Sequence, residues 1–421
     1  MKSQGGAARR AALALSIAAA LAAVAGCGSS SGSSSASSSG KVTLTFFGAD
    51  YGTGPSNSTT KYWDAVATAF HQAHPSITVN VQTVNWTDFP TKSATLIQNK
   101  QHPDIMEGNP APPYAQSGLI YPVSDVLSPS VAGNLIPKFL KDGQYQGVNY
   151  GIPFTTSTRA MYYNKKIFAA AGISAPPKTW TELQADAAKI KAKGDIGYGM
   201  PLGSEEAQAE TAIWFYGAGG GYGDAKKLTI DSSENVEGAT EMQKIITQGF
   251  TEANPGSTNR TPLMNVFIQG QLGMQVGLPP IVGQIKDKNP SLQYGIAPIP
   301  TKDGSSFTLG VADHLMAFKN KTDKTDAITK FLDYFYSKDV YTKWVSAEGF
   351  LPTTKSGADA MSSDETIKPF LDLLPDAKFY PSTNPNWSAA QGAIQSQIGQ
   401  LGQGAVPADL LKSIQAKADG Q

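Results

Sequence analysis

The sequence predicts an α/β protein with two domains, and three observations support this fold class. Strand-like and helix-like segments alternate from residue 41 onward, which is the pattern of parallel βαβ units. About 380 residues follow the amino-terminal segment, enough for a large core and more typical of two domains than of one. Cys27 is the only cysteine among the 421 residues, so core burial rather than disulfides must hold these domains together.

The amino-terminal segment, residues 1–26, has the pattern of a secretory signal peptide. Lys2, Arg9 and Arg10 precede an apolar block over residues 11–25. A helix of that length rises about 22 Å, which is short of the ~30 Å hydrocarbon core of a bilayer. We therefore expect a cleaved signal rather than a permanent membrane span.

Cys27 follows Val24-Ala25-Gly26, and small residues directly before a thiol resemble a bacterial lipobox. In that motif the cysteine is lipidated, with palmitate among the acyl chains, and becomes the first mature residue. Residues 27–40 are then this cysteine and a flexible Ser/Gly linker. Because two or more acyl chains hold a protein stably on a bilayer, we expect a membrane-anchored protein on the extracellular or periplasmic side. The alternative is a spare cysteine in an ordinary signal peptide.

The charge balance disfavours nucleic acid and anionic ligands. The chain has 34 basic and 34 acidic side chains, and removing the three basic residues of the signal leaves 31 against 34. Arg159 and Arg260 are the only arginines after the signal, and no basic run occurs. We therefore expect no nucleic-acid partner, and a phosphate held by an arginine clamp is disfavoured.

The first part of the folded chain alternates strand, helix, strand, helix, strand. Trp63, Val66 and Phe70 recur at helical spacing, which predicts an amphipathic helix that stops near Pro75. In order, we expect a strand over 41–50, this helix over 60–75, a strand over 77–84, a helix over 91–99 and a short strand over 103–106.

The alternation continues after residue 150 with longer helices. A strand over 159–164 leads into a short helix ended by Gly172, and Thr179 or Thr181 caps the next helix. Further helices are predicted near 205–217, 233–249, 259–269, 324–337, 387–401 and 407–418, and further strands over 271–277 and 292–300.

Ligands of α/β proteins bind at the carboxyl ends of strands or between lobes. The residues that follow the predicted strands are polar or aromatic, with almost no positive charge: Asp50, Tyr51, Trp86, Glu107, Asn109, Gly277–Pro279, Ala312, Asp313 and His314. Aromatic faces pack on the C–H faces of sugar rings, and carboxylates and amides bind sugar hydroxyls. This set of residues therefore favours a carbohydrate site.

Three tryptophans are candidates for stacking on a sugar, each with core packing as the alternative. Trp387 begins a predicted helix after a loop rich in Pro and Asn, and Trp86 follows a strand. Trp214 lies inside an apolar helix, where core packing is the more common role. Tyr222 and Trp344 are predicted to be structural.

Catalytic and metal-binding patterns are weak. Ser58–Lys61 matches S-x-x-K without its partner motifs, and His71 and His74 lack the other ligands of a zinc site. The glycine-rich stretch 217–224 follows a helix rather than a strand, so it is interpreted as a turn and not as a phosphate loop. We expect no cofactor and no metal.

Five segments, in one order, resemble the sugar-binding lipoproteins of ATP-driven (ABC) importers, the maltodextrin-binding type of extracellular solute-binding protein family 1. They are residues 103–125 (PDIMEGNPAPPYAQSGLIYPVSD), 150–183 (with YYNKK and APPKTW), 267–277 (FIQGQLGMQVG), 294–301 (YGIAPIPT) and 349–356 (GFLPTTKS). The resemblance implies a two-lobe, periplasmic-binding-protein-like (type II) fold with three hinge crossings and a ligand cleft between the lobes. The implied lobes are residues 41–153 with 300–350, and residues 154–299 with 351–421.

The resemblance also implies ligand contacts. The matching positions are Asp50, Tyr51, Glu107, Asn109, Ser157, Asp313, His314 and Trp387, beside which Trp86 and Trp214 remain aromatic candidates. Leu278-Pro279-Pro280 stands where the family often has a tryptophan, which favours a carbohydrate other than maltodextrin.

The predicted function is capture of a neutral mono- or oligosaccharide and its delivery to the transmembrane subunits of an ABC permease, by a monomer that is not an enzyme. One alternative is a receptor for a non-sugar solute, such as a polyol, a glycerophosphodiester or a peptide. The other is a secreted glycoside hydrolase, in which Asp50 with Glu107 or Asp313 would lie about 5–9 Å apart.

Overall fold

The computed structural model describes residues 40–52, 54, 55, 57–108 and 112–420. The predicted signal peptide, the lipidation site Cys27, nearly all of the linker and the candidate Asn109 therefore lie outside the described residues. Lys41–Gln421 form one compact unit. None of the helices described in this unit combines the length and the apolar character needed to cross a bilayer.

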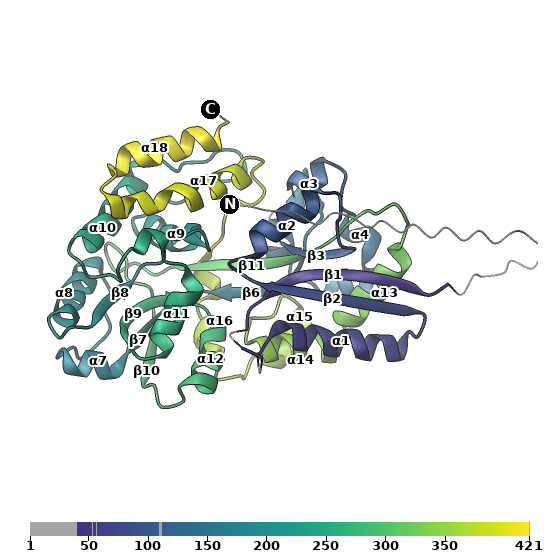
Figure 1. Ribbon diagram of the computed structural model, residues 1–421, viewed down its shortest axis with the longest axis horizontal. Coiled ribbons are helices and arrows are strands. Elements are labelled where there is room, and N and C mark those ends of the chain that lie inside the picture. Colours follow the sequence, from purple (N-terminus) through teal and green to yellow (C-terminus); the bar gives the residue numbers. More distant parts are fainter. Residues whose placement is uncertain (1–39, 53, 56, 109–111, 421) are drawn as a thin grey trace, which may run out of the picture. The chain divides into compact units, whose positions relative to one another are not determined.

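Two sheets organise the compact unit (Figure 1). The six-stranded sheet has the order β12-β11-β3-β1-β2, with β6 added to β11. The four-stranded sheet has the order β10-β7-β9-β8. We call the six-stranded sheet with its helices the N-terminal lobe, and the four-stranded sheet with its helices the C-terminal lobe.

The strands of the N-terminal lobe are β1 (Val42–Asp50), β2 (Ile77–Asn85), β3 (Ile105–Gly108), β6 (Ile152–Thr158), β11 (Thr308–Ala317) and β12 (Ala377–Lys378). Those of the C-terminal lobe are β7 (Ala160–Asn164), β8 (Ile196–Gly199), β9 (Leu272–Gly277) and β10 (Tyr294–Ala297). A separate antiparallel pair consists of β4 (Gln144–Tyr145) and β5 (Val148–Asn149).

The α-helices are α1 (Thr59–Ala73), α2 (Phe89–Gln98), α3 (Pro112–Gln116), α4 (Val123–Val126), α5 (Pro129–Asn134), α6 (Pro137–Asp142), α7 (Lys165–Ala170), α8 (Trp180–Lys191), α9 (Ala207–Gly217), α10 (Ser233–Thr247), α11 (Arg260–Ile268), α12 (Pro280–Lys288), α13 (Thr325–Phe335), α14 (Lys338–Glu348), α15 (Lys355–Met361), α16 (Lys368–Leu371), α17 (Trp387–Gln397) and α18 (Pro407–Ala418). Short 3₁₀ turns cover Pro255–Ser257, Leu374–Asp376 and Ile398–Gln403.

The parallel βαβ units predicted for the first part of the chain are confirmed. Strand β1 pairs in parallel with β2 and with β3, and α1 and α2 connect these strands. The apolar face of α1 packs on the sheet through Trp63, whose ring centroid lies 4.3 Å from that of Phe46 and 4.7 Å from that of Trp344. The structural role predicted for Trp344 is therefore confirmed, because its ring is buried in this aromatic core.

The C-terminal lobe is a mixed sheet rather than a purely parallel one. Strand β7 pairs antiparallel with β9 and β10, whereas β8 and β9 are parallel. Of the two predicted caps of α8, the structure selects Thr179. Its hydroxyl accepts a hydrogen bond from the Glu182 N–H at 3.2 Å, while the Glu182 carboxylate accepts one from the Thr179 N–H. Helices α17 and α18 lie beside α9 and α10 (Figure 1).

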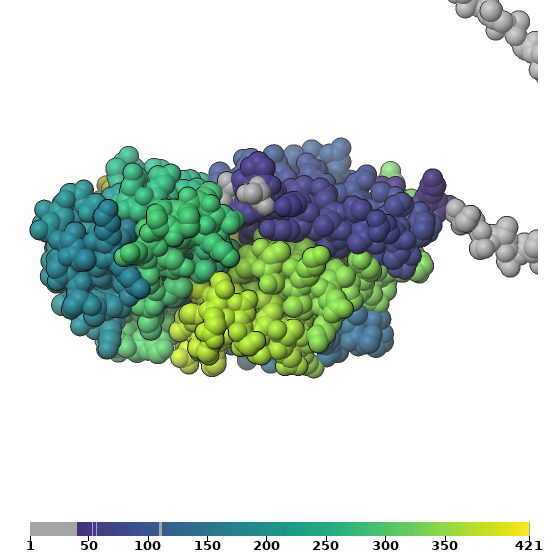
Figure 2. Space-filling model, turned by 90° about the horizontal axis from the view of Figure 1, so that it is seen from below, coloured from purple at the N-terminus to yellow at the C-terminus, as the bar shows by residue number. Residues whose placement is uncertain are grey.

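The chain connects the two lobes at three places. Arg159 alone separates β6 from β7, and the segment after Ala297 leads from β10 into β11. The third connection leads from β12 to α17. Shortly before it, the Phe370 carbonyl of α16 accepts a hydrogen bond from the Thr158 hydroxyl at the end of β6, at 2.8 Å. Figure 2 shows the yellow-green segment that holds α16 lying against both the green and teal residues and the residues near α14.

One prediction about the strands is wrong. We expected Asp313 and His314 to follow a strand, but both lie inside β11, and Glu107 likewise lies inside β3. Every residue of β11 is buried, so the strand is covered on both faces and lacks the alternating pattern that marks a half-exposed strand. Its register with β6 shifts between Asp313 and His314, which is a bulge that redirects side chains at this point.

Candidate ligand-binding site

A cavity of about 250 Å³ lies between the two lobes, and a smaller one of about 70 Å³ adjoins it. We call them the larger and the smaller cavity. They share five lining residues, namely Trp86, Glu205, Glu206, Val311 and Asp313. The two cavities therefore form one continuous site, walled by both lobes and crossed by β11.

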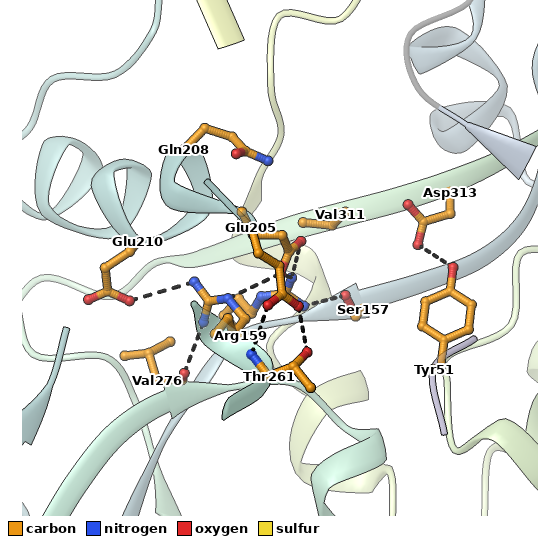
Figure 3. Close-up of polar contacts among 12 residues, drawn as sticks. Tyr51, Ser157, Arg159, Glu205, Gln208, Glu210, Thr261, Val276, Val311 and Asp313 are labelled. Atoms are coloured by element: carbon orange, nitrogen blue, oxygen red, sulfur yellow. Dashed lines mark hydrogen bonds and ion pairs between the residues drawn. The ribbon is translucent and has the colours of Figure 1, made fainter. Parts of the chain in front are cut away.

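Tyr51 links two acidic residues of the site. Its hydroxyl is hydrogen-bonded to the Glu107 carboxylate. The same hydroxyl lies 3.1 Å from an Asp313 carboxylate oxygen (Figure 3). The second Glu107 oxygen accepts a hydrogen bond from the Ala49 N–H at 2.8 Å. A hydroxyl has one proton and cannot donate to two carboxylates at once. One of these two carboxyl groups must therefore carry a proton for both contacts to be hydrogen bonds.

The pKa values of this pair agree with a shared proton. Burial, followed by the charge of Asp313, holds the pKa of Glu107 well above its ordinary value. Burial, followed by the charge of Glu206, raises the pKa of Asp313 to about 6. Arg159 opposes this rise but does not cancel it.

The predicted contact Asp50 mainly organises its own loop. Its carboxylate accepts hydrogen bonds from the N–H groups of Gly52 and Thr59, each at 2.9 Å, and from the Ser58 hydroxyl at 2.6 Å. It thereby holds the loop that leads into α1. Asp50 also lines the smaller cavity, so one edge of it faces the site.

The two arginines of the described chain converge on the smaller cavity, which the sequence analysis did not foresee. Arg159 donates to the Ser157 hydroxyl at 2.8 Å and to the Glu206 carboxylate at 3.1 and 3.2 Å (Figure 3). Arg260 pairs with Glu206 at 3.1 Å and with Glu210 at 3.7 Å. The predicted site residue Ser157 thus lies in the smaller cavity, beneath a buried ion-pair cluster. The sequence disfavours anionic ligands because arginines are few, but both of these arginines lie at the site. Their charges are neutralised there by Glu206 and Glu210.

Glu206, which pairs with both arginines of this cluster, has a strained backbone conformation. Its φ angle is +56°, in the left-handed region that a residue with a side chain rarely adopts. It immediately precedes α9 and is the most exposed member of the cluster, with 26% of its side chain accessible. Strained residues gather at binding sites, and Glu206 lines both cavities.

Glu205, the neighbour of Glu206, is held from the other side. The Thr261 hydroxyl donates to one of its carboxylate oxygens at 2.5 Å, and the Thr261 N–H donates to the other at 3.1 Å. Burial raises the pKa of Glu205 above its ordinary value. Nothing in the sequence pattern marked the adjacent pair of glutamates as site residues.

Two of the three candidate tryptophans line the site. Trp387 begins α17 as predicted, lines the larger cavity and stacks on Tyr380 with ring centroids 5.2 Å apart. Trp86 is half-buried, lines both cavities and meets Tyr51 edge-on at 5.5 Å. Together the rings form apolar walls on opposite lobes.

Trp214 is placed in the core instead. Its ring is 2% exposed, lies 5.4 Å from Trp180 and donates its N–H to Glu210 at 3.2 Å. It lines neither of the two cavities formed by the described residues. The prediction that Trp214 is a ligand contact is therefore wrong. The apolar helix α9 directs this side chain into the core, which was the stated alternative.

His314 and Asp142 also line the larger cavity. The His314 Nε2 atom lies 3.0 Å from the Phe139 carbonyl oxygen, and burial lowers the pKa of His314 to about 4. This histidine is therefore neutral at neutral pH. Asp142, which the sequence analysis missed, ends α6 and has a pKa raised to about 7 by burial despite the nearby Lys138.

The chain is similar to known solute-binding proteins. The family described as bacterial extracellular solute-binding protein matches residues 55–342. A binding protein of Brucella abortus (strain 2308) is 36% identical over 395 residues, covering 90% of this chain and 93% of the relative. The maltotriose-binding protein of Pyrococcus abyssi is 26% identical over 301 residues, covering 68% of this chain and 62% of that protein.

Solved structures agree on the fold. The ABC transporter solute binding protein of Thermotoga lettingae, bound with α-D-tagatose, superposes with a TM-score of 0.80 at 23% identity. The superposition covers 90% of this chain and 99% of that one. At this identity the likeness concerns the fold, and the two-lobe α/β fold predicted from the sequence is confirmed.

Proposed function

This chain belongs to the family of bacterial extracellular solute-binding proteins, and from that membership we propose that it is the substrate-binding subunit of an ABC importer. Its ligand is a mono- or oligosaccharide, which it delivers to the transmembrane subunits of a permease. The sequence predicts a neutral sugar, and the neutralised arginines of the site support the exclusion of anionic ones.

One observation carries the proposal: the cavity between the lobes combines aromatic walls with hydrogen-bonding carboxylates. Trp86 and Tyr380, which stacks on the buried Trp387, offer faces on which the C–H groups of a sugar ring can pack. Glu107, Glu206 and Asp313 offer acceptors for its hydroxyls. A buried site of matched acceptors also rejects ligands that lack those hydroxyls.

The proposed mechanism is closure of the lobes on the ligand. The lobes contact each other, because the Gln284 side-chain N–H group on α12 lies 3.3 Å from the Tyr51 carbonyl oxygen. A sugar that contacts Trp86 on one lobe and Trp387 on the other favours the closed form over the open one. The permease then receives a sugar-loaded, closed receptor.

We propose Asp50, Tyr51, Trp86, Glu107, Asn109, Ser157, Asp313, His314 and Trp387 as ligand contacts, with Glu206 added and Trp214 removed. The lobes are proposed largely as the sequence implies, residues 41–153 with 300–350 and 154–299 with 351–421. Two boundaries move, one to Arg159 and one to the segment after β12, because β6 and β12 both pair with β11 in the six-stranded sheet.

The remaining parts of the proposal concern location and assembly. We propose a protein that acts as a monomer on the outer face of the cell membrane, held by lipid on Cys27 after removal of residues 1–26. The Ser/Gly composition of residues 28–40 supports a linker between this anchor and the compact unit.

A carbohydrate panel tests the function. Purified full chain is heated with each of a set of mono- and disaccharides, polyols and short peptides. A sugar at 100 times its Kd stabilises the folded state by about 2.7 kcal/mol, and small-angle scattering in its presence shows a more compact particle. Stabilisation by a polyol or peptide alone, or by a sugar without compaction, contradicts the proposal.

A further inference from the structure

The larger cavity is strongly acidic. Five of its lining residues are carboxylates, Glu107, Asp142, Glu205, Glu206 and Asp313. No lysine or arginine occurs among the described residues that line it. The neutral imidazole of His314 adds no positive charge.

The nearest arginines are already matched by other carboxylates. Glu206 pairs with both Arg159 and Arg260, and Glu210 pairs with Arg260 from the core. These two positive and two negative charges cancel. Arg159 lowers the pKa of Asp313 and Lys138 lowers that of Asp142, but both pKa values stay above the ordinary value, so these carboxylates are compensated only in part.

The hydrogen bonds described for these other carboxylates come from neutral groups. Tyr51 and the Ala49 N–H donate to Glu107, and Thr261 donates to both oxygens of Glu205. The Thr155 hydroxyl donates to Asp313 at 3.4 Å, and the Tyr51 hydroxyl, which has one proton, is shared between Asp313 and Glu107. Several carboxylates buried around one cavity are costly when all of them are ionised.

A second observation concerns the side-chain oxygen of Gln284, a buried acceptor to which none of the described residues donates a hydrogen bond. Gln284 lines the smaller cavity and is only 4% exposed, and its side-chain N–H group is directed to the Tyr51 carbonyl. Its side-chain oxygen is buried and has no hydrogen-bond partner within the described part of the chain. An unpartnered buried acceptor costs about 1–3 kcal/mol, so this oxygen is suited to accept a hydrogen bond from a ligand.

Aromatic rings face this acidic surface. Tyr380 and Trp387 stack on each other and line the larger cavity from the C-terminal lobe, and Trp86 lines it from the N-terminal lobe. Carboxylates combined with aromatic faces are the surroundings in which proteins bind organic ammonium groups.

We propose that the ligand is an amino sugar whose protonated amine binds beside Glu107 and Asp313. The inference rests on the proposed function and changes one property of the ligand, from neutral to cationic. In the empty protein, protons compensate the cavity carboxylates, in agreement with the raised pKa values of Glu107 and Asp313. A bound ammonium group takes over that role.

Matched pairs of sugars test the inference with the full chain. Isothermal titration compares D-glucosamine with D-glucose and D-galactosamine with D-galactose, each pair differing in one amine against one hydroxyl, and chitobiose with cellobiose, which differ in two. We expect at least one amino sugar to bind roughly 10-fold or more tightly than its hydroxyl twin. Its N-acetylated form, which is larger but uncharged, is expected to lose that advantage.

A charge variant adds a second measurement. Asp313→Asn removes one negative charge at nearly constant volume and is expected to reduce the amine preference by roughly 10-fold. If that variant fails to fold, Glu107→Gln serves instead. Asp326→Asn, a carboxylate whose side chain is 81% exposed on α13, is the control and leaves the preference unchanged.

The outcomes separate the two proposals. Equal affinities for an amine and its hydroxyl twin, or equal affinities for the amine and its N-acetylated form, overturn the amino-sugar inference and leave the sugar receptor standing. If no sugar of the panel binds, both proposals fail. An amine preference that survives both charge variants shows that these carboxylates do not provide it, and overturns the inference.

Discussion

Tyr51 and Asp313 are 262 positions apart, yet the hydroxyl of Tyr51 lies 3.1 Å from an Asp313 carboxylate oxygen. Tyr51 directly follows β1, and Asp313 lies at the bulge of β11 beside the crossing strand β6. This contact therefore joins a loop of the N-terminal lobe to a strand that leads between the lobes. From the proposed function we therefore expect a ligand that contacts Asp313 to act on the hinge and on Tyr51 together.

Removal of the Tyr51 hydroxyl tests this contact. In Tyr51→Phe, Glu107 and Asp313 lose a shared donor while the ring contacts remain, so the free energy of unfolding is expected to fall by about 1–3 kcal/mol. Sugar affinity is expected to fall as well, since the carboxylates lose their fixed positions. Urea denaturation and titration calorimetry measure the two effects. Tyr145→Phe is the control, because its hydroxyl only accepts an exposed hydrogen bond from Gln146. A Tyr51→Phe protein as stable as the control would show that the bridge contributes nothing.

Trp387 is expected to contribute to both stability and binding. Its ring is 1% exposed, so Trp387→Ala is expected to lower the free energy of unfolding by about 3–5 kcal/mol. Trp344→Ala is a matched control, with a tryptophan that is 2% exposed but packs on Trp63 away from the cavities. We expect similar losses of stability, measured by denaturant unfolding, but a loss of sugar affinity only for Trp387→Ala. Equal affinities in the two variants would remove Trp387 from the site.

Glu348 makes stability depend on pH. Burial raises the pKa of this carboxyl group to about 8, so the folded state keeps a proton that the unfolded chain releases near its ordinary pKa. The stability that goes with this proton is fully present below the unfolded pKa and is lost as pH rises toward 8. Glu348→Gln is neutral at all pH values, and we expect it to be more stable than the wild type at pH 8 by on the order of 1–3 kcal/mol.

The comparison of melting curves at pH 5 and pH 8 checks this expectation. The advantage of Glu348→Gln is expected to shrink at pH 5, where both proteins are neutral at this position. Asp326→Asn, at an exposed carboxylate, serves as the reference for general effects of charge. An advantage that is the same at both pH values would contradict the assignment.

Glu206 is expected to be essential for the ion-pair cluster. Glu206→Ala leaves Arg159 and Arg260, which are 2% and 3% exposed, without their common partner. Removal of one member of a buried ion pair costs about 3–5 kcal/mol. Glu237→Ala, which breaks the half-exposed pair with Lys302, is expected to cost only about 0–1 kcal/mol. Urea unfolding distinguishes the two, and equal losses would mean that the cluster is not a stabilising unit.

Much of the candidate site could be predicted from the sequence, because several of its residues lie where strands and helices end. Trp86 follows β2 and Trp387 begins α17, and both line the cavity as expected. Asp313 lines the cavity as the sequence predicts, but it lies inside β11 rather than after a strand. Glu206 was missed, because a glutamate before an apolar helix has no pattern that distinguishes it from a surface residue.

The sequence by itself determined the α/β class, the order of the elements and the resemblance to one family, because apolar periodicity and caps such as Thr179 are set by neighbouring residues. Only the tertiary structure decided which residues meet. The pairing register of β11 brought Asp313 to Tyr51, and the orientation of α9 turned Trp214 into the core. The packing of α11 on β9, the neighbour of β7, brought the two arginines to Glu206. The reason is physical: such contacts join residues that are far apart in the chain, and they depend on how whole elements pack rather than on any local pattern.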